Sequence, residues 1–486
     1  MSTVSIWPLR LAVVLLCLFV RPAAGFEWIV EPVVEGAWPQ IAADLVFDEE
    51  AGAFLLAYEH SIHGVKFTKG YSQASGHIDW ETSAWVDSCT IYSWPDLAVA
   101  WPDIFILWAY YQYWGKDVYL SHSSDGGSSF GGSLLVATFA YNHNIAIDPT
   151  LGEIVVVYWH QDGLLLRRSQ DWGASFLEPQ IVDSLTDYIH TMEFAISDDG
   201  VYHVAYIDSL IPSHFYYRVN YRRSENQGRT WSYHRLDEEP GRCEAVVLAL
   251  DDAGNPMIGW IDIPMRRFLF RRSWDQGMSF EPIVPIDTTE NFKYTTSIAA
   301  DAEGNPHLAW WADFVPAWVW YTSSLDSGQT FLPAVPVDPE TLASQWGPTI
   351  AIGGSGLPVI VWEDRRNDQY GDLWYGAAVP TGVEEETEEL APFIENVRLL
   401  PSYPNPFHSS TSIVYELTRQ EHVSLRVYDV LGRLVQVLVD AHREAGRHRV
   451  LWDGLDQRGV QVSSGIYFSY LESSSKSVVR SMVLLR

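Results

Sequence analysis

The feature that most constrains the fold is an eight-residue signature, Ser-x-Asp-x-Gly-x-x-(Phe/Trp), that recurs along the chain. Its five copies begin at Ser123, Ser169, Ser224, Ser273 and Ser324, so that successive copies start 46, 55, 49 and 51 residues apart. A nearly constant period of this length predicts a repeat architecture, in which every repeat is one small structural unit that packs on its neighbours.

Each repeat contains four short strand-forming runs separated by turn residues. In the repeat around Ser273 these runs cover 245–250, 257–261, 268–272 and 281–286. Asp, Gly, Asn and Pro fill the turn between the first two runs, where they supply hairpin backbone angles at little cost. Four strands per repeat are typical of a β-propeller blade, and because no long 3.6-residue period occurs, a helical solenoid is disfavoured.

The repeat can be laid seven times along residues 26–380. The first copy is degenerate, and the last ends at Tyr375 without a fourth strand. The segment Phe26–Val34 is similar to the fourth strands of other repeats, such as 280–286. We expect it to complete the last blade and close the ring, since closure removes exposed sheet edges. The sequence thus predicts an all-β propeller of seven blades, with six blades as the alternative.

The signature resembles the Asp-box, or bacterial neuraminidase repeat, of sialidase-type propellers. The resemblance implies a hairpin between the third and fourth strands of a blade, where the carboxylate accepts hydrogen bonds from turn N–H groups and the final aromatic ring packs beneath the blade. One copy has Asn in place of Asp, an exchange that suits a structural acceptor better than a catalytic charge. We therefore assign structural roles to Asp125, Asp171, Asn226, Asp275 and Asp326.

The N-terminus has the features of a secretory signal peptide over residues 1–25. Arg10 precedes the apolar run 11–20, and small residues follow before a cleavage site at Phe26. The apolar run is too short to span a bilayer, and no other transmembrane segment is predicted. We expect an exported protein that is secreted or held on a bacterial cell surface.

The net charge limits the classes of binding partner, and the cysteine content limits the possible disulfides. The net charge of −31 disfavours nucleic acid and anionic membranes as partners. Cys89 and Cys243 lie in different repeats and fit either one disulfide or two buried thiols. No spacing of His, Cys, Asp or Glu matches a metal site and no cofactor motif occurs, so neither a metal nor a cofactor is predicted.

A second domain is predicted behind an acidic linker. The linker, residues 381–394, includes the run VEEETEEL, which is typical of a solvated segment. Residues 395–486 carry short alternating strands and turns, a pattern that predicts a small Ig-like β-sandwich.

Within this second domain, YPNPF at 403–407, VYDVLG at 427–432 and SGIY at 464–467 resemble the C-terminal sorting domain of type IX secretion and the related Ig-like domain of the flagellar hook-capping protein. The resemblance implies the outer-membrane secretion machinery as a partner, with removal of the domain or surface attachment after export. A plain Ig-like module without a sorting role is the alternative.

An aromatic residue close to an acid recurs where the second strand of each repeat ends. Trp and Tyr faces stack on sugar rings, and carboxylates accept hydrogen bonds from hydroxyl groups. A scaffold that holds these loops around one rim would make a ligand site, whereas packing inherited from the repeat is the alternative explanation. The candidate ligand-binding residues are Trp159, Asp208, Trp260, Asp262, Trp310, Asp313, Trp362 and Asp364.

These features predict a secreted or surface propeller that binds glycan or another extracellular polymer through an aromatic and acidic mouth. The first alternative is an exo-sialidase-type glycoside hydrolase, for which the resemblance implies three arginines, a tyrosine nucleophile with a glutamate partner, and a general acid. The family's Arg-Ile-Pro segment is absent, since 38–41 reads WPQI. The second alternative is a structural surface protein. The candidates for catalysis are Arg242, Arg266, Arg365, Tyr294 and Glu244.

Overall fold

The computed structural model describes residues 26–34, 40–60, 63–73, 75–88, 94–112, 115–184, 188–209, 217–238, 241–287, 293–312, 317–339, 341, 343–366, 371–380, 397–399, 407, 411–417, 419–429, 433–444, 446–458, 460–463, 465–473 and 477–484. The predicted signal peptide, the predicted linker, Cys89 and Asp313 lie outside these ranges. Every regular element in the described residues is a β-strand, which confirms the all-β class. The chain divides into two compact units, Met1–Val383 and Glu384–Arg486.

Within the described residues, the first unit consists of seven successive antiparallel sheets, which we number 1 to 7. The long strand β10 (Leu134–Asp148) belongs to both sheet 2 and sheet 3 and joins them into one continuous seven-stranded sheet. Sheet 1 contains β2 (Gln40–Asp48), β3 (Ala53–His60), β4 (Val65–Ser72), β5 (Ile78–Trp80) and β6 (Ala84–Asp87). Sheet 2 contains β7 (Asp96–Ala100), β8 (Asp103–Gln112), β9 (Gly115–Ser123) and the first part of β10 (Leu134–Asp148). Sheet 3 contains the rest of β10, β11 (Glu153–His160), β12 (Gly163–Ser169) and β13 (Gln180–Asp183).

Sheets 4 to 6 follow the same order of strands. Sheet 4 contains β14 (Ile189–Ile196), β15 (Tyr202–Ser209), β16 (Tyr217–Ser224) and β17 (Ser232–Arg235). Sheet 5 contains β18 (Cys243–Leu250), β19 (Pro256–Asp262), β20 (Arg267–Arg272) and β21 (Val284–Asp287). Sheet 6 contains β22 (Lys293–Ala300), β23 (Pro306–Ala312), β24 (Trp318–Ser323) and β25 (Val335–Pro336).

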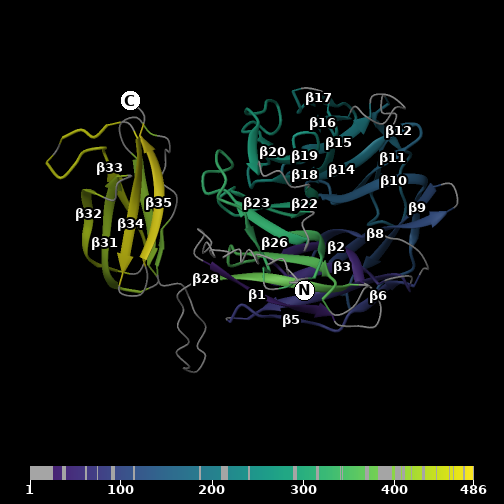
Figure 1. Ribbon diagram of the computed structural model, residues 1–486, viewed down its shortest axis with the longest axis horizontal. Coiled ribbons are helices and arrows are strands. Elements are labelled where there is room, and N and C mark those ends of the chain that lie inside the picture. Colours follow the sequence, from purple (N-terminus) through teal and green to yellow (C-terminus); the bar gives the residue numbers. More distant parts are fainter. Residues whose placement is uncertain are drawn as a thin grey trace, which may run out of the picture. The chain divides into compact units, whose positions relative to one another are not determined.

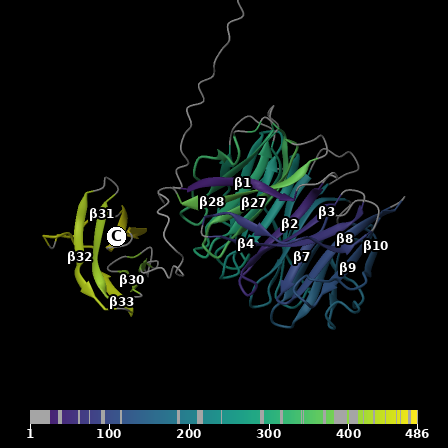
Figure 2. The same cartoon turned by 90° about the horizontal axis from the view of Figure 1, so that it is seen from below.

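Sheet 7 is built from both ends of the unit. It contains β26 (Gln345–Ile352), β27 (Pro358–Asp364), β28 (Asp372–Pro380) and the N-terminal strand β1 (Phe26–Val34). β1 pairs antiparallel with β28 from Phe26↔Pro380 to Val34↔Leu373, and Figure 1 and Figure 2 show the two strands side by side. The predicted role of Phe26–Val34 as the fourth strand of the last repeat is confirmed.

The first and second strands of the sheets differ in burial. The second strands β11 and β15 are buried along almost their whole length, whereas the first strands β14 and β18 alternate between buried and half-buried residues. First strands of successive sheets contact one another from β2 through β7, β10, β14, β18 and β22 to β26, and β26 contacts β2. The first strands therefore share one side that keeps some contact with solvent.

Polar side chains link the first strands of sheets 1 to 4. The Asp44 carboxylate accepts a hydrogen bond from the Leu97 N–H (2.7 Å), and Asp96 accepts one from Ile145 (2.8 Å). Between sheets 3 and 4, the side-chain oxygen of Asn144 accepts a hydrogen bond from the Phe194 N–H (3.2 Å). Such bonds between sheets satisfy backbone donors that the antiparallel ladders leave open.

Hydrophobic cores lie between neighbouring sheets. In one of them Val155 and Val157 of β11 pack against Tyr202, Val204 and Tyr206 of β15. Each such side chain contributes about 1.5–3 kcal/mol when it is fully buried. The stability of each sheet thus depends on its neighbours, as expected for a repeat fold.

The second unit is a sandwich of two sheets. One sheet pairs β29 (Val397–Leu399), β30 (Thr411–Leu417) and β33 (Gly446–Trp452). The other pairs β32 (Leu434–Arg443), β31 (Glu421–Asp429), β34 (Gly465–Ser473) and β35 (Ser477–Leu484). Buried Trp452 packs edge-on against Phe407 and Tyr467 in the core between them. This unit is the Ig-like domain that the sequence predicts.

Candidate functional site

The strands of each sheet in the first unit begin and end on two opposite sides of that sheet. On one side the first strand begins and the second strand ends; we call this side the start edge. At the opposite edge lie the turn between the first and second strands and the turn formed by the signature; we call it the hairpin edge. The described candidates for ligand binding and for catalysis belong to the start edge, and the signature residues belong to the hairpin edge.

Three of the predicted ligand-binding tryptophans are completely buried. Trp260, Trp310 and Trp362 have no more than 1% of their surface exposed. Their rings fill the space between sheets, as where Trp310 meets Phe268 edge-on at 5.4 Å. The repeat places these rings on the face of the second strand that packs on a neighbouring sheet. Contrary to the prediction, they offer no face to a sugar.

The predicted acidic partners are mostly engaged by protein groups. Asp208 is buried and paired with Arg218, and it also accepts a bond from the Asn220 amide (2.8 Å). Asp364 is fully buried and binds the guanidinium of Arg366 (2.6 Å). Half-buried Asp262 accepts a bond from a backbone N–H three residues later (3.3 Å). These contacts match the alternative that the acids stabilise their own loops.

The catalytic candidates lie at the start edge of sheets 5 to 7, each in a local contact. Arg242 pairs with Glu244 at 3.2 Å. The Arg266 carbonyl accepts a bond from the buried ammonium of Lys293 at 2.9 Å. The remaining two candidates lie further along the edge, where Tyr294 stacks on an indole at 4.5 Å and Arg365 binds a carboxylate at 3.0 Å.

Exposed aromatic residues occur at the start edge where the sequence prediction did not place them. Trp94 (58% exposed) lies two residues before β7, Phe139 (51%) lies where β10 passes from sheet 2 to sheet 3, and Tyr188 (38%) directly precedes β14. We call these three residues the aromatic arc. Trp94 and Tyr188 stand just before the first strand of their repeats, and this position was the sequence signal for these two residues.

Two side chains contact Trp94 of the aromatic arc, and the backbone around Phe139 is strained. The Lys116 ammonium lies 3.9 Å from the centre of the Trp94 ring, and burial lowers the pKa of Lys116 to about 8. His143 contacts the Trp94 carbonyl at 2.9 Å. Phe139 and Asn142 adopt φ angles of 52° and 41°, which side chains rarely tolerate. Strain of this kind clusters at binding sites, where surrounding structure maintains it.

A chain of aromatic contacts supports the third member of the arc. Trp159 packs against Tyr141 at 5.1 Å and against Tyr188 at 5.0 Å. Tyr188 in turn meets His190 at 4.8 Å, and His190 meets Tyr217 at 4.3 Å. Among the predicted ligand residues, Trp159 thus lies beneath an exposed ring rather than forming the surface itself.

At the hairpin edge the five signatures share one hydrogen-bond pattern. The side-chain oxygen at the Asp position accepts a bond from the signature Ser hydroxyl (2.7–3.0 Å) and one from the N–H four residues later (2.8–2.9 Å). The Gly N–H donates to the same Ser hydroxyl at 2.7–3.0 Å. The residues at the Asp position are Asp125, Asp171, Asn226, Asp275 and Asp326.

The exchange of Asp for Asn in the third copy leaves this pattern intact. The Asn226 oxygen takes the two acceptor contacts, and its amide donates to the Thr230 hydroxyl at 2.8 Å. In the first copy the hydroxyl and N–H of Ser129 lower the pKa of Asp125 to about 2. The polar atoms of both side chains form hydrogen bonds with groups of their own turn, as expected for a structural hairpin.

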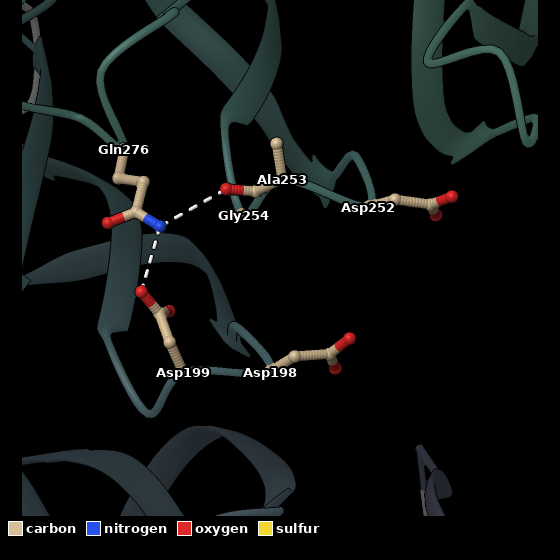
Figure 3. Close-up of a pocket in the computed structure, with 6 residues that line it drawn as sticks. All are labelled: Asp198, Asp199, Asp252, Ala253, Gly254 and Gln276. Atoms are coloured by element: carbon tan, nitrogen blue, oxygen red, sulfur yellow. Dashed lines mark hydrogen bonds between the residues drawn. The ribbon is translucent and has the colours of Figure 1, made fainter.

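A hollow of about 230 Å³ opens between turns of the hairpin edge (Figure 3). Asp198, Asp199 and Asp252 line it, and the Gln276 amide donates to Asp199 (2.9 Å) and to the Ala253 carbonyl (3.1 Å). Burial and the neighbouring carboxylates raise the pKa of Asp252. This crowding of acids repels anions, and nothing else at the hollow points to a ligand.

The described residues contain neither a cluster of metal ligands nor a helix that could span a membrane. No group of three or more His, Cys, Asp or Glu side chains among them is arranged to hold a metal ion. No helix in the same residues has the length and apolar character needed to cross a membrane. Cys243 is a buried free thiol whose pKa burial raises to about 12, and the question of a bond to Cys89 lies outside the described residues.

Comparison with known proteins supports the fold of both units. Residues 407–477 match the family of FlgD Ig-like domains. An ulvan lyase, a polysaccharide lyase, is 12% identical, covers 72% of this chain and 94% of its own, and has a TM-score of 0.51. A fungal alcohol oxidase solved with copper is 9% identical over 95% of this chain and all of its own, with a TM-score of 0.50. These similarities concern the fold alone.

A more distant similarity links the chain to a bacterial surface protein. PorZ, a component of the type IX secretion system of Porphyromonas gingivalis, is 13% identical over 91% of this chain and 59% of its own, with a TM-score of 0.46. No curated protein matches the chain.

Proposed function

We propose that the protein is an extracellular glycan-binding propeller whose ligand lies on the aromatic arc. Trp94, Phe139 and Tyr188 carry this proposal, because three large aromatic side chains at the start edges of sheets 2 to 4 remain exposed. Exposed aromatic faces stack on the CH groups of sugar rings. Exposure forgoes the free energy that these apolar side chains would gain by burial, and Phe139 in addition has a positive φ, which lowers stability.

The scaffold in this proposal is a closed, sialidase-like propeller of seven blades built from Asp-box repeats. Two observations support closure: β1 completes the sheet that contains β28, and contacts of the first strands lead from β26 back to β2. Closure would set the start edges of all seven sheets around one rim. Ligands commonly bind at such a rim because rigid strands position the loops.

The location in this proposal is outside the cell. Residues 1–25 act as the signal peptide, and the Ig-like unit acts as a type IX sorting domain that engages the outer-membrane secretion machinery. The match of residues 407–477 to the FlgD Ig-like family supports this assignment. Deletion of residues 395–486 should leave the protein in the periplasm of a host with type IX secretion, and normal export of the truncated chain would refute the sorting role.

The glycan proposal is tested by affinity electrophoresis of the full chain in gels that contain xylan, laminarin or polygalacturonate. We expect at least one polysaccharide to retard the protein. Replacement of two rings, by Trp94→Ala with Phe139→Gly, should weaken binding by about 2 kcal/mol, or roughly 30-fold in Kd. Trp172→Ala is the matched control, because Trp172 is 44% exposed at the hairpin edge. Equal mobility of all variants in every gel would refute the proposal.

A further inference from the structure

Arg365 and Arg366 directly follow β27 and differ in how many of their hydrogen-bond donors are paired. The Arg366 guanidinium binds Asp338 (2.5 Å) and Asp364 (2.6 Å) and lies on the ring of Trp374 at 3.6 Å. The Arg365 side chain donates one hydrogen bond, from Nε to Glu363 (3.0 Å), and is 34% exposed. Within the described part of the chain, the two terminal nitrogens of Arg365 have no hydrogen-bond partner. Arg366 stabilises the fold, whereas Arg365 keeps donors available.

The available guanidinium is held rigidly. It lies 3.7 Å from the centre of the Trp346 ring, in the usual geometry of a cation–π contact. Trp346 stacks on Trp311 at 5.9 Å, and Trp311 stacks on Tyr294 at 4.5 Å. This stack spans the start edges of sheets 6 and 7. Because folding already orders Arg365, a ligand that binds it loses little additional conformational entropy.

The partner carboxylate is also fixed. Glu363 is 9% exposed, and a Cβ added at Gly371 would lie 2.6 Å from its Cγ, so the backbone packs closely behind it. Burial raises the pKa of Glu363, and the bond from Arg365 opposes that rise. Arg365 and Glu363 thus place hydrogen-bond donors beside an acceptor at one point of the start edge. Neighbouring hydroxyl groups of a sugar match such a pair.

We infer that Arg365 and Glu363 form a second sugar-binding subsite, and that the ligand is therefore a polysaccharide chain rather than a single sugar or a disaccharide. The inference rests on the proposed function, since the aromatic arc supplies the first subsite. The arc occupies sheets 2 to 4 and the pair belongs to sheet 7. Packed sheets are about 10 Å apart, so two steps from sheet 7 through sheet 1 to sheet 2 separate the subsites by roughly 20 Å. Two linked sugar rings do not bridge that separation.

The experiment compares a polymer with its disaccharide in the full-length protein. Binding of xylan and xylobiose, and of polygalacturonate and digalacturonate, is measured by affinity electrophoresis and calorimetry. Arg365→Gln should weaken polymer binding about tenfold and leave disaccharide binding at the arc unchanged. Arg365→Lys should behave similarly, because a single ammonium lacks the fork of donors. Arg229→Gln, an exposed arginine of a signature turn, is the matched control.

The outcomes separate this inference from the proposed function. If Arg365→Gln binds the polymer as the natural chain does while Trp94→Ala weakens it, the second subsite is refuted and the arc stands. If Arg365→Gln weakens polymer and disaccharide equally, the sites form one compact pocket and the polymer inference is refuted. If neither variant changes any binding, both proposals are refuted. Thermal unfolding of every variant checks that the fold is retained.

Discussion

The two edges of the first unit use similar residue types for different purposes. At the hairpin edge, Ser, Asp or Asn, and Gly recur at intervals of 46 to 55 residues, and their polar groups bond to one another within each turn. At the start edge the residues vary from sheet to sheet, and Trp94, Phe139 and Arg365 keep exposed faces or available donors. A repeated group whose bonding capacity is filled inside its own turn serves folding. A non-repeated group that remains exposed is the better candidate for function, and Phe139 does so at a strained positive φ.

The largest expected effect tests whether the buried tryptophan rings near the start edge stabilise the fold. Trp260→Ala should lower the free energy of unfolding by about 3–5 kcal/mol, because it leaves a large cavity between sheets. Trp94→Ala should change it by less than about 0.5 kcal/mol. Urea denaturation measures both. If Trp260→Ala kept its stability and lost polysaccharide binding, the division between the two groups of tryptophans would be wrong.

The next effect tests the close packing of the hairpin edge. Gly277 has a φ of 83°, and an added Cβ would lie 1.8 Å from the hydroxyl oxygen of Tyr221. Gly277→Ala should therefore destabilise the protein by about 3 kcal/mol, from overpacking and a left-handed backbone together. Gly241→Ala, near the start edge, is the control, because nothing lies within 4 Å of its added Cβ. Equal thermal unfolding temperatures for the two variants would contradict the packing argument.

A smaller effect concerns the acidic first strands that connect the two edges. Burial and the charge of Asp44 raise the pKa of Glu193 to about 8, and burial and the same neighbour raise the pKa of Asp96 well above its usual value. An acid whose pKa is raised by folding binds more protons in the folded state, so its contribution to stability is complete below pH 4.5 and is lost as pH rises to about 8.

Stability should accordingly fall by about 2 kcal/mol between pH 5 and pH 9, after allowance for the half-buried position of Glu193. Glu193→Gln should remove most of this fall, because the amide cannot ionise. Glu178→Gln, at an exposed position, should leave the profile unchanged. Unfolding is followed by denaturant titration at pH 5, 7 and 9. A profile of Glu193→Gln identical to that of the natural chain would exclude this carboxylate as the source.

The smallest effect tests whether strain at the start edge is retained for binding. Phe139→Gly should stabilise the fold by about 1 kcal/mol, since glycine adopts a φ of 52° without penalty, and it should weaken polysaccharide binding. Gln276→Gly at the hairpin edge removes a similar strain, but it also removes two amide hydrogen bonds, so no net gain is expected. Loss of stability in Phe139→Gly would show that the ring serves packing.

Sequence reasoning was most successful where a pattern repeats. The period of the signature predicted strands and turns in the right order, and the likeness of Phe26–Val34 to other fourth strands predicted its pairing with β28. It failed for Trp260, Trp310 and Trp362, because a repeated aromatic residue looks the same in sequence whether its ring faces solvent or a neighbouring sheet. That difference depends on the packing of sheets.

The all-β class, the repeat unit and the strand pattern of the Ig-like second unit could be predicted from the residues alone, and the bonding within the signature turns was implied by the resemblance to the Asp-box. These follow from local periodicity and turn chemistry, which act within a few residues. The exposure of each ring, the pairing of each acid, and the contrast between the available donors of Arg365 and the paired guanidinium of Arg366 became visible only in the folded chain. Burial and pairing depend on residues tens of positions away, and their contacts exist only once neighbouring sheets have packed.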